Sequence, residues 1–247
     1  TVNFSQNLPE RCLMPEKIYT IPINEAFDAC AAEPSEGCPF CRLKAMLEQN
    51  ELDIILGGAM MEPDVRIKTN EQGFCRRHFD NMLGKNNRLG IGLILESHLD
   101  ELRGKLEPGG ISALLKGGSA AAALERLDKL DEGCYLCGRV NHSFDRMLSN
   151  AAYLWDSDGE FRAKTKAQPY FCLPHFKLWS KAARTEMSKK RFEEFYAAAS
   201  EVVLAYFDTL RADVSWFCKK FDYRYDAEPW GNSKDAVERA VKFLRGV

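Results

Sequence analysis

The stretch GCPFC (37–41) recurs as GCYLC (133–137), and each copy places two cysteines three residues apart. A second type of motif follows each copy: GFCRRHF (73–79) in the first half and YFCLPHF (170–176) in the second, each with a cysteine and a histidine at that same spacing. Residues three apart lie on one face of a helix, so each motif can direct two ligand atoms toward one point. These four motifs set the organisation that we expect for the chain.

The motifs belong to an internal repeat. A shift of 96 residues superposes the first Cys-x2-Cys pair on the second, and a shift of 97 superposes the two Cys-x2-His pairs. Between the motifs, R-x-K-T at 66–69 also matches R-x-K-T at 162–165. This internal match predicts that the halves share a structural element and arose by duplication, as two helical units each organised around one Cys3His metal site.

The ligand types favour zinc, which takes three cysteines and one histidine tetrahedrally with every position filled by protein. The predicted metal ligands are Cys38, Cys41, Cys75, His78, Cys134, Cys137, Cys172 and His175, and they imply two zinc ions. Proline is tolerated in the first turn of a helix, so Pro39 and Pro174 place their motifs at helix starts. The simplest pairing gives each half its own complete site. A crossed pairing, in which Cys38 and Cys41 meet Cys172 and His175, stays open.

Other chemistries compete with structural zinc. An iron–sulfur cluster can take such ligands, but no denser cysteine run favours it. Reactive Cys-x2-Cys thiols would suit a redox enzyme or sensor, although the strand–helix setting of thioredoxin is missing. A catalytic zinc keeps one position for water, whereas each set here has four protein ligands. No Ser–His–acid set or phosphate-binding glycine loop is visible, so the sequence favours a binding or interaction module over an enzyme. An enzyme with a pocket between the helical halves is a third hypothesis.

The fold class is predicted to be all-α. Apolar residues recur every three to four positions over about 188–222, which predicts one long C-terminal helix. Further helices are expected from Asn24, from Pro39 to Gly57-Gly58, from Cys75 to about Lys85 and over 87–107, the last with its leucines spaced for one face. Later helices are expected after Ser119, over 135–155, from Cys172, and from a cap at Ser233.

The expected organisation along the chain has five parts. Residues 1–14 form a disordered N-terminus outside the core, 15–106 the first Cys/His unit, and 107–118 a Gly- and Pro-rich linker. Residues 119–187 form the second unit, and helices over 188–247 pack on both units.

Composition excludes several classes of function. Net charge is −2 over 247 residues, with no block of one sign that would indicate nucleic-acid binding. No apolar run reaches the about 20 residues that a membrane helix needs, and the N-terminal stretch lacks a signal-peptide pattern. We therefore expect a cytoplasmic protein, in which nine cysteines indicate metal or redox chemistry before disulfides. The expected partner is an unknown protein or small molecule, and the oligomeric state is left open.

The remaining special residues have simpler interpretations. His142 could contact the metal site from outside but is more typical of a surface or core residue. His98 and the unpaired cysteines 12, 30 and 218 are expected to be ordinary core residues. An aromatic cluster is expected to continue the core at the end of the long helix, and consists of Trp216, Phe217, Phe221, Tyr223, Tyr225 and Trp230.

The stretches KIYTIPINEAF, CPFC, RIKTNEQGFCRRHF and NRLGIGLILESHL resemble a family of uncharacterised bacterial proteins that is frequent in Clostridia. Some of its members are labelled as transporter substrate-binding proteins. The resemblance covers about residues 17–106 well and the second motif pair more loosely. It implies a bacterial, cytosolic, duplicated Cys/His protein and no established activity.

Overall fold

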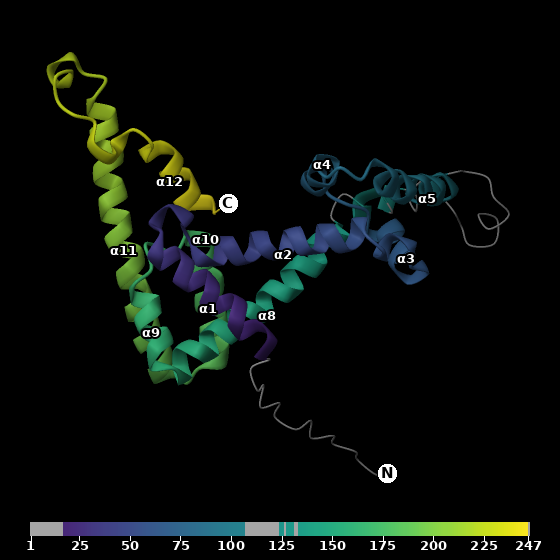
Figure 1. Cartoon of the computed structure of the whole chain (residues 1–247), viewed down its shortest axis with the longest axis horizontal. Coiled ribbons are helices and arrows are strands. Elements are labelled where there is room, and N and C mark those ends of the chain that lie inside the picture. The colour runs from purple at the N-terminus through teal and green to yellow at the C-terminus, as the bar shows by residue number, and fades with distance from the viewer. Residues whose placement is uncertain (1–16, 107–123, 126, 131–132, 247) are drawn as a thin grey trace, which may run out of the picture. The chain divides into compact units, whose positions relative to one another are not determined.

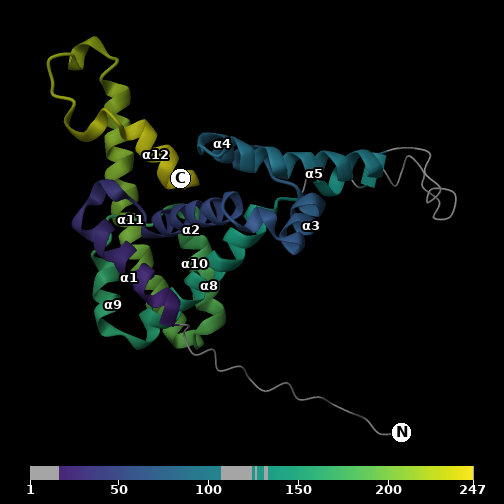
Figure 2. The ribbon, with the colours of Figure 1, turned by 45° about the vertical axis from the view of Figure 1, so that its right-hand side comes forward.

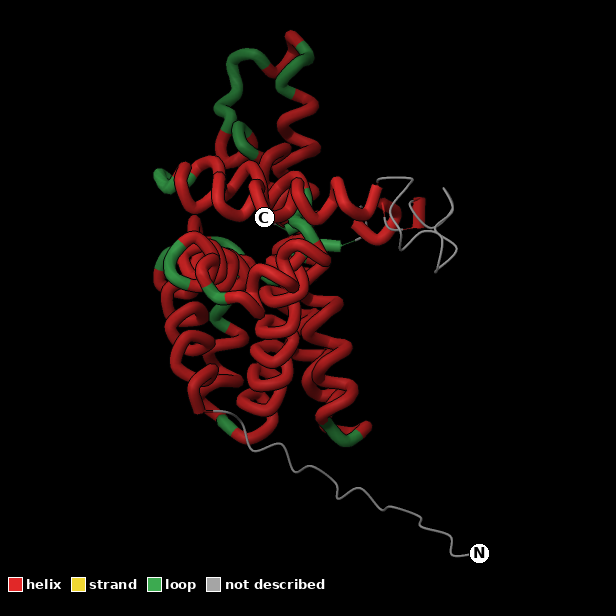
Figure 3. Tube along the Cα trace, turned by 90° about the vertical axis from the view of Figure 1, so that its right-hand side faces the viewer, coloured by secondary structure: helices red, strands yellow, loops and turns green. Residues whose placement is uncertain are grey.

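The computed structural model describes residues 17–106, 124–125, 127–130 and 133–246. All regular elements in these ranges are helical, as the uniformly red helices of Figure 3 show, so the predicted all-α class is confirmed. None of the described helices is both long enough and apolar enough to span a bilayer. The N-terminus 1–14 with Cys12, the linker 107–118 and the helix start expected at Ser119 fall outside the described residues.

The chain forms two compact units. Unit 1 combines residues 1–43 with 145–247, and unit 2 comprises residues 44–144. The boundaries fall inside two long helices, α2 (Pro39–Leu56) and α8 (Tyr135–Ser157), so unit 2 is an insertion within unit 1. The compact units therefore do not coincide with the two halves of the sequence repeat.

Unit 1 is an assembly of helices, which Figure 1 labels, around a core of aromatic side chains. Its further elements are α1 (Lys17–Ala32), α9 (Gly159–Lys166), α10 (Leu173–Glu186), α11 (Lys189–Lys219) and α12 (Ala236–Arg245), with short 3-10 turns at 34–36, 223–225 and 231–233. Helix α11 contacts α9, α10 and α12. Six aromatic side chains with no exposed surface form the core: Phe27, Phe40, Phe161, Phe171, Trp179 and Phe195. Burial of such large rings contributes strongly to the folding free energy of this unit.

Unit 2 contains η2 (Ala59–Met61), α3 (Pro63–Gln72), α4 (Arg76–Gly84) and α5 (Arg88–Leu106), together with the distal part of α2 and the first turns of α8. Helix α3 lies beside α5 (Figure 2). The core is aliphatic with two aromatic rings: Leu52, Ile55, Leu56, Phe74, Met82, Ile91, Ile94, Tyr135 and Leu136. It therefore offers fewer large side chains than the core of unit 1.

The R-x-K-T match marks a helix present in both halves. Arg66, Lys68 and Thr69 lie on α3, and their counterparts Arg162, Lys164 and Thr165 lie on α9. Both threonines are buried, and each hydroxyl donates to a carbonyl of the preceding turn. The predicted shared element is confirmed, and α2, α4 and α11 also begin and end close to their predicted positions.

Three expectations about helices were wrong in detail. Helix α1 begins at Lys17, so Asn24 is internal and its amide donates to the carbonyl of Thr20. Helix α5 buries Ile91, Ile94 and His98, while Leu89, Leu99 and Leu106 are exposed. Periodicity alone could not choose between the two faces, because both are apolar. Ser233 belongs to a 3-10 turn and donates to Trp230, and α12 begins after Asp235.

The aromatic cluster at the end of α11 was expected to be core, which was wrong for two of its six members. Phe221 and Tyr223 are 74% and 83% exposed. The loop is held instead by Lys220, whose buried ammonium donates to the carbonyls of Tyr225, Asp226 and Glu228 and lies over the Trp230 ring. These polar contacts satisfy a charge that burial would otherwise make costly.

Candidate metal centres

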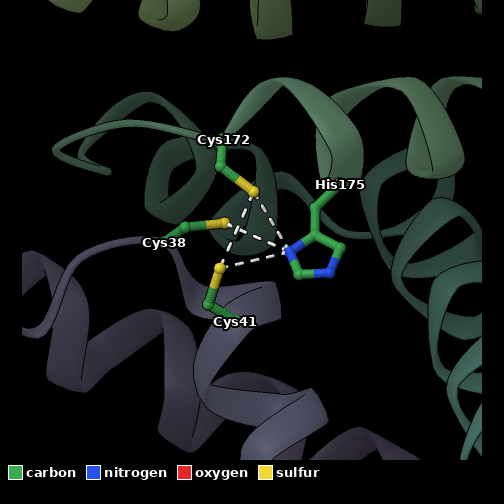
Figure 4. A group of neighbouring side chains, drawn as sticks. All are labelled: Cys38, Cys41, Cys172 and His175. Carbon is green, nitrogen blue, oxygen red and sulfur yellow. Dashed lines mark hydrogen bonds between the residues drawn. The ribbon is translucent and has the colours of Figure 1, made fainter. Parts of the chain in front are cut away.

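Four ligand-type side chains meet inside unit 1 and form a group that we call site A. Cys38 and Cys41 come from the start of α2, and Cys172 and His175 come from the start of α10 (Figure 4). His175 Nδ1 lies 3.3 Å from Cys41 Sγ, 3.2 Å from Cys172 Sγ and 3.9 Å from Cys38 Sγ. The sulfurs of Cys41 and Cys172 are 3.6 Å apart. All four residues are buried.

Unit 2 contains the corresponding group, which we call site B. It combines Cys75 and His78 at the start of α4 with Cys134 and Cys137 at the start of α8. His78 Nδ1 lies 3.1 Å from Cys134 Sγ, 3.3 Å from Cys75 Sγ and 3.4 Å from Cys137 Sγ. Here only the histidine is buried, and the three cysteines are partly exposed.

The spacing in both groups matches the edges of a tetrahedron around one ion. Zinc–sulfur and zinc–nitrogen bonds of about 2.3 and 2.0 Å give sulfur–sulfur edges of about 3.8 Å and sulfur–nitrogen edges of about 3.5 Å. The Sγ atoms of Cys41 and Cys172 in site A are 3.6 Å apart, and those of Cys75 and Cys137 in site B are 3.9 Å apart. Disulfide sulfurs would lie at about 2.0 Å, and all eight described cysteines are free. Each group could therefore hold one metal ion.

Each motif begins at a helix N-terminus, as Pro39 and Pro174 had predicted. The first cysteine immediately precedes its helix, and the second ligand lies in the first turn. Free backbone N–H groups and the positive end of the helix dipole then face the sulfurs. The N–H of Cys137, for example, donates to Cys134 Sγ at 3.4 Å. This arrangement stabilises thiolates, which are the metal-binding form.

The thiols of site A titrate as a coupled set. Hydrogen bonds from Cys172 and Cys38 hold the pKa of Cys41 well below its usual range. Burial raises the pKa of Cys38. Hydrogen bonding with Cys38 lowers the pKa of Cys172, but hydrogen bonding with Cys41 and burial outweigh it and raise that pKa to about 12. Without a metal, one thiolate shared among three sulfurs is the favoured charge state, so an arriving cation would displace the remaining protons.

Site B differs in the groups that surround it. Burial acts to raise the pKa of Cys75, but backbone N–H groups of the first turn and the neighbouring thiols lower it overall. Burial is also the main reason why the pKa of His78 is lowered, which keeps the imidazole neutral and able to bind a cation. Its other nitrogen, Nε2, lies 2.8 Å from Glu48 Oε1, and Arg77 pairs with the same carboxylate. A carboxylate behind a ligating histidine fixes the ring and its tautomer.

Glycines allow the segments of each site to approach closely. In site B, a Cβ on Gly133 would lie 2.8 Å from the carbonyl oxygen of Gln72, and the N–H of Tyr135 donates to the carbonyl of Gly73. In site A, Gly246 has a φ of 78°, and a Cβ there would lie 3.6 Å from Cys172 Sγ and 3.8 Å from Cys41 Sγ. The end of α12 therefore covers site A.

The ligand pairs combine across the halves of the repeat. The simplest expectation, in which Cys38 and Cys41 meet Cys75 and His78, was wrong, and the crossed pairing is the one observed. Helix α2 rises about 27 Å over its 18 residues, and the 10 residues of α3 rise only about 15 Å. The chain is thus carried away from Cys38 before it reaches Cys75. Sequence spacing allowed both pairings, and helix length decides between them.

Three residues that the sequence singled out belong to neither metal site. His142 is exposed and lines a surface pocket. Cys218 is exposed, contrary to expectation, whereas Cys30 is buried as expected.

Glu48, seven residues beyond Cys41, was not among the predicted site residues. Its counterpart at the shift of 96 is Phe144, so no repeat signal marked it. Gly246 was missed as well, because no local pattern links it to cysteines far back in the chain.

Fold and sites together define a class: an all-helical protein in which two Cys3His groups, each able to hold a metal ion, assemble at helix starts. The chain belongs to a family of unknown function (DUF6062), which matches residues 14–247. No curated protein and no solved structure was found to match it.

Proposed function

We propose that sites A and B each bind one zinc ion, and that the protein is a zinc-stabilised helical binding module. The observation that carries the proposal is the convergence of three sulfurs and one imidazole nitrogen within 4.8 Å of one another, twice in one chain. Soft thiolates with one imidazole in a tetrahedral shell favour zinc over harder cations.

A structural role follows from the number of ligands. Four protein ligands leave no position for a reacting water, which a catalytic zinc keeps open. In site A the ligands join the starts of α2 and α10, which lie more than a hundred residues apart in the sequence, so the free energy of metal binding becomes free energy of folding. The segment that follows α11 in the same unit presents the exposed aromatic side chains Phe221 and Tyr223, which suit a protein or small-molecule partner.

Thiol redox chemistry is the second candidate, and the partial exposure of Cys75, Cys134 and Cys137 is the observation that favours it. A four-iron cluster fits less well, since its ligands surround four irons and lie farther apart than the ligands of a single ion. If the cysteines of site B are reactive thiols, they will react rapidly with a thiol reagent, provided that the protein has never been exposed to a chelator. Zinc-bound thiolates would be protected from it.

Metal analysis of the purified protein tests the proposal. We expect two zinc per chain and no visible absorbance, with both ions located by anomalous scattering at the zinc edge. A stably folded protein without metal would contradict the proposal. A brown protein with visible absorbance would replace zinc by an iron–sulfur cluster.

A further inference from the structure

A pocket of about 400 Å³ lies in unit 2, beside the helix that carries Cys134 and Cys137. Helix α8 supplies one wall through Tyr135, Gly138, Arg139, His142 and Ser143, which recur every three to four residues and therefore share a face. The opposite walls are Lys68 and Gln72 of α3 and Glu51 of α2. The volume is within the range of sites for small organic ligands.

The lining of this pocket contains an arginine that is held in place. Glu51 is 8% exposed, and its carboxylate lies 2.5 Å from Arg139 Nε. The Arg139 guanidinium also lies 5.8 Å from the centre of the Tyr135 ring. A guanidinium has five N–H donors in a planar fork, so a single bond at Nε leaves most of them for another acceptor. Fixing the group beforehand lowers the entropy lost when a ligand binds.

The charges around the pocket favour an anion. Arg139 and Lys68 contribute two positive charges against the single negative charge of Glu51. Among the described residues Lys68 forms no ion pair, although Asp64 lies one turn away on the same helix. Gln72, His142 and Ser143 add further hydrogen-bonding groups to the pocket lining. A pocket with one organised guanidinium, one uncommitted ammonium and several other hydrogen-bonding groups suits an oxyanion.

Gly138 leaves room for the ligand. A Cβ at this position would meet no atom within 4 Å, so the pocket is open above the α8 backbone. The same helix face begins at Tyr135, between two ligands of site B. The function proposed for the metal sites leaves this face of α8 unassigned.

We infer that this pocket binds a small organic anion through its carboxylate or phosphate group. Arg139 and Lys68 hold the oxyanion, Gln72, His142 and Ser143 bond its polar atoms, and the open space over Gly138 receives the rest of the molecule. The inference depends on the pocket alone and holds whichever metal occupies site B.

Titration calorimetry of the full chain with inorganic phosphate and with succinate, at constant ionic strength, tests the inference. Two variants remove the site by different means: Lys68→Gln removes a charge, and Gly138→Leu fills the open space. Each has a matched control, Lys190→Gln on an exposed position of α11 and Gly92→Leu at a helical glycine of unit 2 that also has no atom within 4 Å of a Cβ. Zinc content and far-UV circular dichroism are measured on all five proteins.

We expect saturable binding of at least one of the two anions to the unmodified protein. Both site variants should weaken it at least fivefold while keeping their zinc and helicity, and both controls should leave it unchanged. Tighter binding of phosphate or of succinate identifies which oxyanion the site prefers. The inference would be overturned if neither anion bound saturably, or if Lys68→Gln and Lys190→Gln bound the anion equally well.

Discussion

Sites A and B have the same ligand set at the same helix positions, yet they lie in different surroundings. The ligands of site A are buried beside an aromatic core and covered by Gly246. The cysteines of site B are partly exposed, and its histidine is held by Glu48. The comparison teaches that ligand identity and spacing give the coordination chemistry, whereas burial and neighbouring groups decide how strongly each site is coupled to folding and how easily it exchanges its ion.

The repeat makes this comparison a controlled one. A shift of 96 or 97 residues carries every ligand of site A onto a ligand of site B: Cys38 onto Cys134, Cys41 onto Cys137, and, in the reverse direction, Cys172 and His175 onto Cys75 and His78. Equivalent substitutions therefore change the same chemical position in two environments. Tryptophan fluorescence separates their effects, because all four tryptophans, at 155, 179, 216 and 230, belong to unit 1.

The largest effect is expected from Cys172→Ser. Loss of a fully buried ligand should remove one zinc and lower the free energy of unfolding of unit 1 by about 4 kcal/mol or more, or about 10 °C in Tm. Cys134→Ser should also remove one zinc but leave the fluorescence transition of unit 1 nearly unchanged. Cys30→Ser, another fully buried thiol of unit 1 outside the ligand set, should cost only about 1–2 kcal/mol and no zinc. Equal shifts of the fluorescence transition for Cys172→Ser and Cys134→Ser would contradict the comparison.

The next effect concerns the carboxylate that only site B has. Glu48→Gln should weaken zinc binding at site B by about 10- to 100-fold, because His78 loses its ionised partner. Site A should keep its affinity. Glu36→Gln removes a similar carboxylate paired with an arginine, Arg42, on the surface of unit 1 and serves as the control. Competition with a chromogenic chelator measures both affinities, and an unchanged site B would show that Glu48 does not position the histidine.

Both sites should lose zinc affinity as pH falls, because thiols with raised pKa values must release protons to bind zinc. The pKa values of Cys38 and Cys172 are raised in site A, so both thiols are protonated near neutral pH and must release protons to bind zinc. In site B, burial raises the pKa of Cys137 to about 12, whereas the pKa of Cys75 is lowered. Each released proton changes affinity by about tenfold per pH unit. We therefore expect affinity to fall by about a hundredfold per pH unit at site A, where two protons are released, and by at least about tenfold at site B between about pH 8 and pH 6. An affinity of either site that does not change with pH would contradict this protonation.

The smallest expected difference is in the rate of metal release. Excess chelator should remove zinc in two phases, because a chelator reaches the partly exposed sulfurs of site B without prior unfolding, whereas the ligands of site A require local opening. The fast phase should disappear in Cys134→Ser and persist in Cys172→Ser. The reverse assignment of the phases would mean that burial in the folded chain does not control exchange.

Much of the fold could be predicted from sequence because the signals were local. Pro39 and Gly57 bound α2, Pro174 lies in the first turn of α10, and the periodic apolar residues of 189–219 form α11. Predictions failed where one stretch of sequence was equally compatible with two structures. Helix α5 has two apolar faces, and the aromatic residues of 216–230 suited either a core or an exposed loop held by Lys220.

The sequence by itself determined the all-helical class, the eight candidate ligands and their positions at helix starts, because each depends on spacings of a few residues along one chain, and it showed the internal repeat directly. Only the tertiary structure decided which pairs meet, which site is buried, and that Glu48 and Gly246 contribute to them. Those outcomes depend on helix lengths and on contacts between residues separated by 30 to 205 positions, the spans from Glu48 to His78 and from Cys41 to Gly246. Local periodicity carries no information about such contacts, since packing selects among pairings that are equivalent in sequence.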